Sequence, residues 1–112
     1  MAIINKRKTG DVEEIWFQSS NIHYTKVDFS KAKKIVRTEA DGITFEVPTI
    51  NVIMVFNRGA QYLYKDVELN DYTSFVEILN RDDNTSHGKA FNKFVKPYPF
   101  EKLDNVDIIT LK

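Results

Sequence analysis

One stretch of the chain decides the fold: residues 51–81, NVIMVFNRGAQYLYKDVELNDYTSFVEILNR. Its first six residues, 51–56, are too few and too rich in β-branched side chains for a helix. They predict a strand that is buried on both faces. Residues 57–60 then supply a turn, in which Gly59 is free to take a positive φ.

After this turn the sequence predicts a second strand and a helix. In residues 61–65, successive side chains of the strand should point to opposite faces, which places Tyr62 and Tyr64 on one face. In residues 70–81, apolar side chains recur at the spacing of a helix that lies across the hairpin. These side chains are Tyr72, Phe75, Val76 and Leu79. The stretch therefore predicts an α+β domain, in which an antiparallel sheet of five to seven strands carries one or two short helices.

The composition is that of a chain that can bury a core of its own. It has 112 residues, of which 42% are apolar, so we expect a single domain. The absence of cysteine excludes disulfides, cysteine zinc sites and thiol chemistry. The 16 basic and 16 acidic side chains cancel, which argues against a protein that binds duplex DNA regardless of its sequence. No stretch resembles a signal peptide or approaches the roughly 20 apolar residues of a membrane span, so we expect a soluble, cytoplasmic protein.

The first 12 residues are polar and end in a Gly-Asp pair. We expect residues 1–12 to form a flexible N-terminal segment, and residues 13–112 to form the domain. Lys6, Arg7 and Lys8 make a short basic run within the segment. This run is either a solvated tail or an arm that contacts phosphate.

The remaining elements follow from alternation and from turn residues. Further strands are expected at residues 14–18, 22–27, 34–38, 43–47 and 105–111. The pair Asp41–Gly42 predicts a hairpin between the third and fourth of these strands. Pro48 should end the strand before it, because proline cannot donate a hydrogen bond to a ladder. Residues 89–95 predict a second helix, stopped by the prolines that follow.

Three pieces of the sequence combine into a family pattern. They are Ser19-Ser-Asn-Ile22, the hairpin with Gly59, Tyr62 and Tyr64, and a later motif of Ser86, Gly88, Phe91 and Asn92. In this order and spacing, over about residues 17–98, they resemble the KTSC domain. That small family is named for a module at the C-terminus of some lysyl-tRNA synthetases.

The resemblance implies the α+β fold and hints at association with nucleic acid. The family occurs often as a free-standing domain in phage and bacterial genomes. This chain departs from its pattern at Val67-Glu68, where the family usually has Val-Pro. Residues 29–50 also look like a hairpin inserted after the first strand, which makes them the place where we expect specialised function.

Catalytic and metal chemistry find no support in the sequence. His23 and His87 are the only histidines, and neither has a second histidine or a carboxylate pair at ligand spacing. Ser86 precedes His87, but sequence neighbours rarely form the hydrogen bond of a catalytic triad. There is no Gly-x-Ser-x-Gly, no phosphate-binding P-loop and no dinucleotide fingerprint. We therefore expect a protein that is not an enzyme and that has no metal or cofactor.

Residues 85–89, Thr-Ser-His-Gly-Lys, are the strongest candidate for a binding site. If Gly88 opens a helix, its free N–H groups, two hydroxyls, an imidazole and an ammonium converge on one anion. Alternatively, Ser86 only caps the helix and Gly88 only permits the turn. Tyr62 and Tyr64 are stacking platforms for bases in one hypothesis and sheet residues packed under a helix in the other. The candidate ligand-binding residues are Thr85, Ser86, His87, Gly88, Lys89, Asn92, Lys93, Lys96, Tyr62 and Tyr64.

These observations leave two hypotheses for the function. The first is a non-catalytic module that binds a phosphate-bearing ligand: RNA, single-stranded DNA or a small nucleotide. The phage setting of the family would make such a module a nucleotide sponge in the host cytoplasm. The alternative is an adaptor or inhibitor that binds a host protein through the hairpin at residues 33–47 or the edge strand at 106–111. A free edge would also permit a symmetric homodimer.

Overall fold

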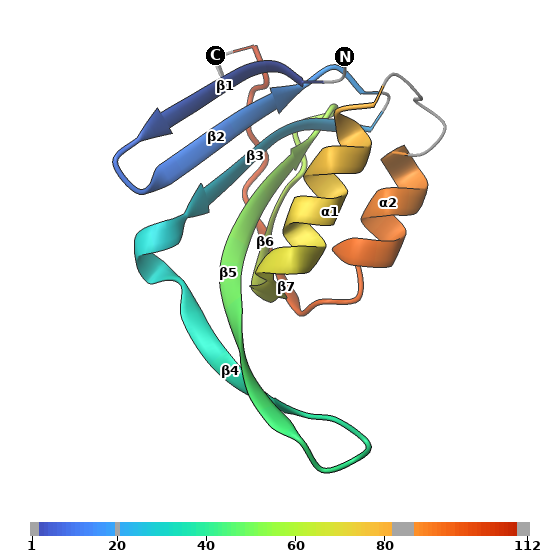
Figure 1. Ribbon diagram of the computed structural model, residues 1–112. Helices are drawn as coiled ribbons and strands as arrows, with labels where there is room; N and C mark the ends of the chain where they lie inside the picture. Colours follow the sequence, from blue (N-terminus) through green and yellow to red (C-terminus); the bar gives the residue numbers. More distant parts are fainter. Residues whose placement is uncertain (1–2, 20, 82–86, 110–112) are drawn as a thin grey trace.

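The computed structural model describes residues 3–19, 21–81 and 87–109, and within these ranges seven strands form one antiparallel sheet (Figure 1). The strands are β1 (Ile3–Thr9), β2 (Val12–Phe17), β3 (Ile22–Asp28), β4 (Lys33–Thr38), β5 (Thr44–Phe56), β6 (Gln61–Glu68) and β7 (Phe100–Leu103). Their spatial order is β1-β2-β3-β5-β6-β7, and β4 pairs with β5 off this path. The predicted α+β class is confirmed.

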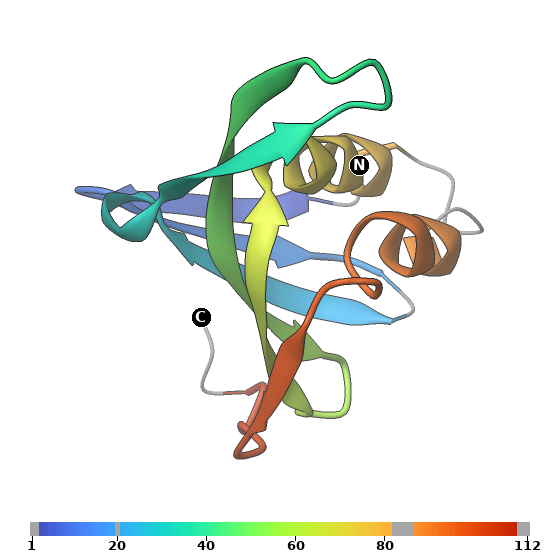
Figure 2. The same ribbon diagram turned by 90° about the horizontal axis from the view of Figure 1, so that it is seen from below.

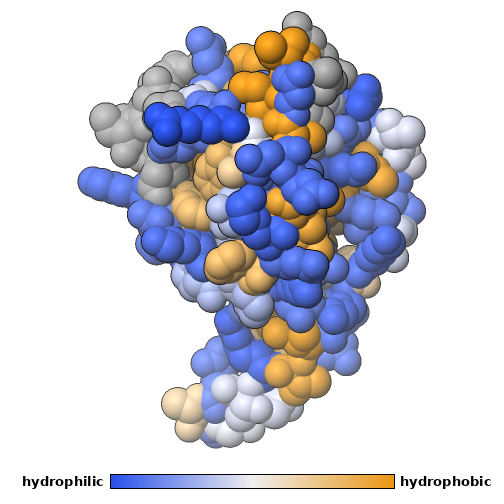
Figure 3. All heavy atoms as spheres, turned by 180° about the vertical axis from the view of Figure 1, so that it is seen from behind, coloured by the Kyte–Doolittle hydropathy of each residue, from blue (hydrophilic) through white to orange (hydrophobic). Residues whose placement is uncertain are grey.

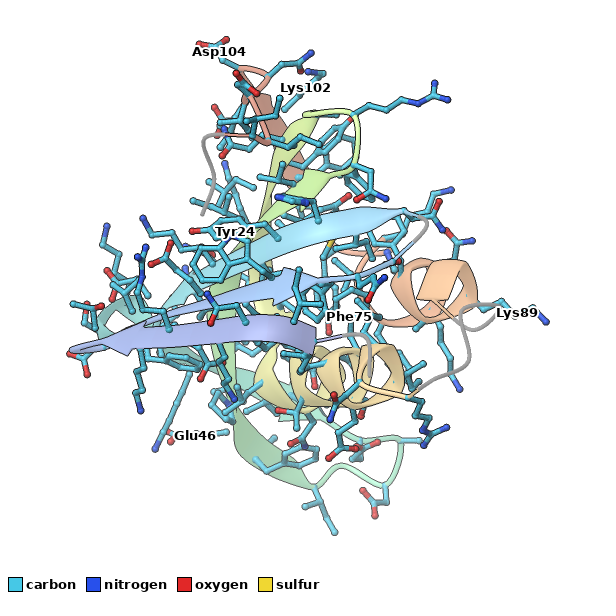
Figure 4. The ribbon with its side chains drawn as sticks, turned by 90° about the horizontal axis from the view of Figure 1, so that it is seen from above. Tyr24, Glu46, Phe75, Lys89, Lys102 and Asp104 are labelled. Atoms are coloured by element: carbon cyan, nitrogen blue, oxygen red, sulfur yellow. The ribbon has the colours of Figure 1, made fainter. Side chains whose placement is uncertain are left out.

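Helices α1 (Leu69–Leu79) and α2 (His87–Phe94) pack on the same face of the sheet (Figure 1). Under them lies the main core, because alternate residues of the central strand β5 point toward the helices. Figure 4 shows Phe75 of α1 pointing into this layer. The buried residues of the main core are Ile15, Phe17, Ile22, Val27, Ile50, Val52, Met54, Tyr64, Val67, Tyr72, Phe75, Leu79, Ala90 and Val95.

A smaller apolar cluster covers the opposite face of the sheet. Trp16, Tyr24 and Val55 are buried there, and Val106 and Ile108 pack over them. The predicted strand at residues 105–111 is wrong for the part that is described, because residues 104–109 form no strand. Val106 and Ile108 are instead partly buried against the back of the sheet, and β7 takes the edge beside β6.

Residues 3–9 form the strand β1, which corrects the expectation of a flexible segment for this described part of residues 1–12. They pair with β2, with one irregularity in register between Ile3 and Asn5. Arg7 donates two hydrogen bonds to Glu14, at 3.0 and 2.7 Å, and its guanidinium carbon lies 5.3 Å from the centroid of the Trp16 ring. Charges on one strand therefore meet opposite charges on the next, and this attachment does not require an apolar pattern.

Two irregularities in the strands also differ from the predictions. Regular alternation along residues 22–27 predicts Ile22 and Tyr24 on one face, but the register of β3 shifts between them and they lie on opposite faces of the sheet. Pro48 does not end its strand. It lies one residue beyond the last β5–β6 pair, Thr49–Glu68, so no residue of β6 faces its nitrogen.

The β4–β5 hairpin, which we call the arm (residues 33–48), stands out from the body of the molecule (Figures 1 and 2). Its turn contains Gly42 with φ of +86°, as the Asp-Gly pair predicts. Before the arm, Asp28 caps the short 3₁₀ turn Phe29–Lys31 by accepting a hydrogen bond from the amide of Ser30.

Within the described part of the chain, no helix is long and apolar enough to cross a membrane.

Candidate functional site

An open cavity of about 340 Å³ lies where β5, β6, β7 and α2 meet. Five aromatic rings and one lysine make up most of its wall. The lining residues are Phe56, Ala60, Tyr62, Tyr64, Phe91, Lys96 and Phe100. This volume is within the range of small-molecule sites, which combine an apolar lining with a few polar groups.

The sheet register explains how the rings come together. Tyr62 pairs with Lys102 and Tyr64 pairs with Phe100 across the β6–β7 ladder, and paired residues share a face. Leu63 points to the other face, where it lines a separate cavity. The alternation predicted for residues 61–65 is thus confirmed, and it places both tyrosines at the aromatic cavity.

The rings contact one another mainly edge to face. Phe100 lies 5.7 Å from Tyr62 and 5.8 Å from Tyr64 between ring centroids. Phe91 of α2 lies 5.8 Å from Tyr64 and 5.3 Å from Phe56. Yet Phe100 remains 59% exposed, which is unusual for so large an apolar side chain. The cavity therefore presents aromatic surface that the protein does not cover itself.

Positive charge lies beside this aromatic surface. Lys96 lines the cavity directly, and the Lys102 ammonium lies 5.7 Å from the centroid of the Tyr62 ring. None of the described residues that line the cavity is acidic. Burial, and then the neighbouring Tyr62, raises the pKa of Tyr64 to about 12. Its hydroxyl therefore stays neutral at physiological pH and can donate a hydrogen bond.

A second cavity of about 260 Å³ adjoins the first. It is lined by Asn21, Ile22, Phe56, Phe91 and Asn92. Phe56 and Phe91 line both cavities, so the two hollows share a wall. The second cavity differs in chemistry, because its wall contains two side-chain carboxamides and no charged group among the described residues.

Comparisons of the chain with protein-family models, with curated proteins and with solved structures find no match. The resemblance to the KTSC domain thus remains a prediction that rests on the motifs quoted above.

The predicted binding residues divide between three places. Tyr62, Tyr64 and Lys96 line the aromatic cavity, and Asn92 lines the second one. Lys89 is exposed on α2, and Figure 4 shows its side chain pointing outward and away from Lys102.

Three more of the predicted residues, His87, Gly88 and Lys93, belong to α2. The Lys93 ammonium lies 5.2 Å from the centroid of the Phe94 ring. His87 and Gly88 are the first residues of α2, as predicted for a helix that opens there. Thr85 and Ser86 lie outside the described residues, so the anion site at residues 85–89 stays a prediction.

Sequence reasoning missed part of the wall. Phe56 was expected only as a strand residue, Phe91 and Asn21 were noted only within the family motifs, and Phe100 was not singled out. The sequence did hold one signal for this wall. Phe100 is a large aromatic residue directly after Pro97-Tyr-Pro99, and two nearby prolines disfavour a buried helix or central strand there. As for metals, no group of three or more His, Cys, Asp or Glu side chains in the described residues is placed to hold an ion.

Proposed function

We propose that this protein is a non-catalytic binding module for a ligand that combines a planar ring with a phosphate. RNA, single-stranded DNA and small nucleotides share this chemistry. The observation that carries the proposal is the convergence of Tyr62, Tyr64 and Lys96 with three phenylalanines around one open cavity.

Stacking accounts for the aromatic part of the proposal. A base stacked on an aromatic side chain contributes about 1–3 kcal/mol, and every base has a face that can stack. Phe100 offers the most accessible ring, and Tyr62 and Tyr64 lie beside it. The neutral hydroxyl of Tyr64 adds a donor that can orient a base edge.

Lys96 accounts for the phosphate. It is exposed just after the end of α2, and it is the one charged residue among the described residues that line the aromatic cavity. An ammonium at the rim can pair with a phosphate while the ring of the same nucleotide enters the cavity. A zero net charge fits a single local phosphate contact better than a long electrostatic track along nucleic acid.

Thermal denaturation with a panel of nucleoside monophosphates and short oligonucleotides tests the proposal. A ligand at 100 times its dissociation constant adds about 2.7 kcal/mol to the free energy of unfolding. Phe100→Ala should weaken binding by about fivefold or more, since it removes the most exposed ring. Phe45→Ala is the matched control, because Phe45 is also an exposed phenylalanine but lies on the arm. Equal affinities for the two variants, or no stabilisation by any ligand of the panel, would overturn the proposal.

A second candidate function is a protein adaptor or inhibitor that acts through the arm. The arm exposes apolar side chains that a two-stranded hairpin cannot bury itself. Val36 and Ile43 are 71% and 61% exposed, and Ile35 and Phe45 share one face of the hairpin. Figure 3 shows hydrophobic atoms on the arm when the molecule is seen from behind. Exposed apolar surface of this kind is typical of protein interfaces.

Sedimentation equilibrium and cross-linking distinguish this second candidate. The double variant Ile43→Ser, Phe45→Ser should abolish binding to a protein partner, or self-association, without changing nucleotide affinity. Loss of nucleotide affinity with intact association would exclude the arm as the interface.

A further inference from the structure

We infer that the second cavity holds the next base of a single-stranded nucleic acid, so that the site takes two successive nucleotides. This inference rests on the proposed function and names its ligand more narrowly. A free mononucleotide would fill the aromatic cavity and leave the neighbouring one empty.

The shared wall is the first argument. Phe56 and Phe91 line both cavities and contact each other edge to face, with ring planes at 87°. Proteins that bind single strands splay neighbouring bases apart and pack them against aromatic side chains. Two rings that line both cavities suit that arrangement, because a base in either cavity can contact them.

The chemistry of the second cavity is the next argument. Asn21 and Asn92 each carry a carboxamide, which both donates and accepts hydrogen bonds. This is the chemistry that recognises the Watson–Crick edge of an unpaired base. The first cavity, in contrast, has an almost wholly apolar wall and suits the face of a base.

The second cavity is also held in place by the sheet. The backbone carbonyl of Asn21 accepts a hydrogen bond of 2.9 Å from the amide of Asn57. The side chain of Asn57 donates one of 2.6 Å to the carbonyl of Ser19. These bonds hold the backbone of Ser19 and Asn21 against the β5–β6 turn, so the backbone of Asn21 needs little reorganisation to meet a ligand.

The charge distribution indicates which of the two nucleotides has its phosphate bound by a charged side chain. Lys96 belongs to the aromatic cavity alone, and none of the described residues that line either cavity is acidic. The phosphate of the stacked nucleotide therefore pairs with Lys96, while the second base makes uncharged contacts. The second nucleotide should accordingly raise the affinity without making the affinity more dependent on salt concentration.

Calorimetric titration of the full chain tests this inference. The probes are uridine monophosphate, the 5′-phosphorylated dinucleotide of uridine, and the deoxyribose counterpart of each. We expect the dinucleotides to bind at least about fivefold more tightly than the mononucleotides. Asn92→Ala should remove this gain and leave the affinity for the mononucleotides unchanged. The matched control is Asn70→Ala, an exposed asparagine in α1, which should change neither affinity.

The outcomes separate the inference from the proposed function. Equal affinity for mononucleotides and dinucleotides would overturn the two-base site and leave the proposed function intact. No binding of either kind would overturn both. A gain that survives both Asn92→Ala and Asn21→Ala would place the second base elsewhere and overturn the assignment. A gain confined to the ribose or to the deoxyribose series would support the two-base site and identify the natural ligand as RNA or DNA.

Discussion

Phe56 of β5 and Phe91 of α2 meet edge to face, with ring centroids 5.3 Å apart, and this contact links the sheet to the helix and forms part of the wall of both cavities. Both rings pack against the main core. The candidate site is therefore not a surface feature added to the fold. Its shape depends on the same packing that stabilises the domain.

Replacing both rings should reveal this coupling. In a double-mutant cycle of Phe56→Leu and Phe91→Leu, we expect a coupling energy of about 0.5–1.5 kcal/mol, as for other aromatic pairs. Urea denaturation of the wild type, the two single variants and the double variant measures it. Losses that simply add would show that the rings pack independently.

Gly59 and Gly42 form a matched pair for a second prediction. Both have positive φ, +89° and +86°, so alanine at either position should cost about 1–2 kcal/mol. At Gly59 a Cβ would also lie 2.3 Å from the backbone oxygen of Val106, whereas at Gly42 it would meet nothing within 4 Å. We therefore expect Gly59→Ala to be clearly the more destabilising in urea denaturation. Equal losses would mean that the segment around Val106 yields freely.

The predictable parts of the fold were those with a strong local pattern. The alternation around Tyr62 and the helical spacing of α1 lie in contiguous residues, and both were confirmed. β1 was missed because it is attached by ion pairs and a cation–π contact with β2, as between Arg7 and Glu14, and such pairing leaves no periodic apolar pattern in the strand itself.

The candidate site was predictable only in part, for a related reason. Tyr62, Tyr64 and Lys96 could be proposed from residue chemistry. Their convergence with Phe100 depends on the β6–β7 register. In this register Tyr64 pairs with Phe100, which is far from it in the sequence. No local pattern specifies such a pairing, and the apolar residues after β7 competed for the role of last strand.

Glu14 should make the stability of the sheet depend on pH. Burial opposes ionisation of its carboxyl, but hydrogen bonds from Tyr24 and Arg7 outweigh burial and lower its pKa. Because the folded state holds the lower pKa, this stabilisation is present above the pKa of the unfolded chain and is lost as pH falls through the folded value. Glu14→Gln should cost about 1.5–3 kcal/mol at neutral pH, and the difference from wild type should shrink in acid.

The control for Glu14 is Glu46→Gln. Glu46 is 66% exposed on the arm and lies 3.8 Å from the Lys34 ammonium. An exposed pair of this kind contributes at most about 1 kcal/mol. Urea denaturation of both variants at neutral and at acid pH makes the comparison. If the stability lost in Glu14→Gln did not change with pH, the charge of Glu14 would not be what stabilises the sheet.

A buried hydrogen bond joins β3 to α1. The hydroxyls of Thr25 and Tyr72 lie 3.1 Å apart, and both side chains are buried. Tyr72→Phe should cost about 1–3 kcal/mol, because it leaves the threonine hydroxyl buried without this partner. Adding Thr25→Val should recover part of the loss, since the unpaired group is then removed as well. Chemical denaturation of the wild type and the two variants tests this, and a double variant less stable than Tyr72→Phe alone would refute it.

Lys96 should carry the salt dependence of ligand binding. For single-stranded nucleic acid, the logarithm of affinity falls with the logarithm of salt concentration by about 0.7 per neutralised phosphate. With a short uridine oligonucleotide, Lys96→Ala should weaken binding and reduce this slope by about that amount. Phe100→Ala should weaken binding with the slope unchanged, because a ring contributes stacking and no charge. Lys89→Ala locates the phosphate independently, because Lys89 points outward from α2. If Lys89→Ala reduced the slope and Lys96→Ala left it unchanged, the phosphate would lie at the start of the helix and not in the aromatic cavity.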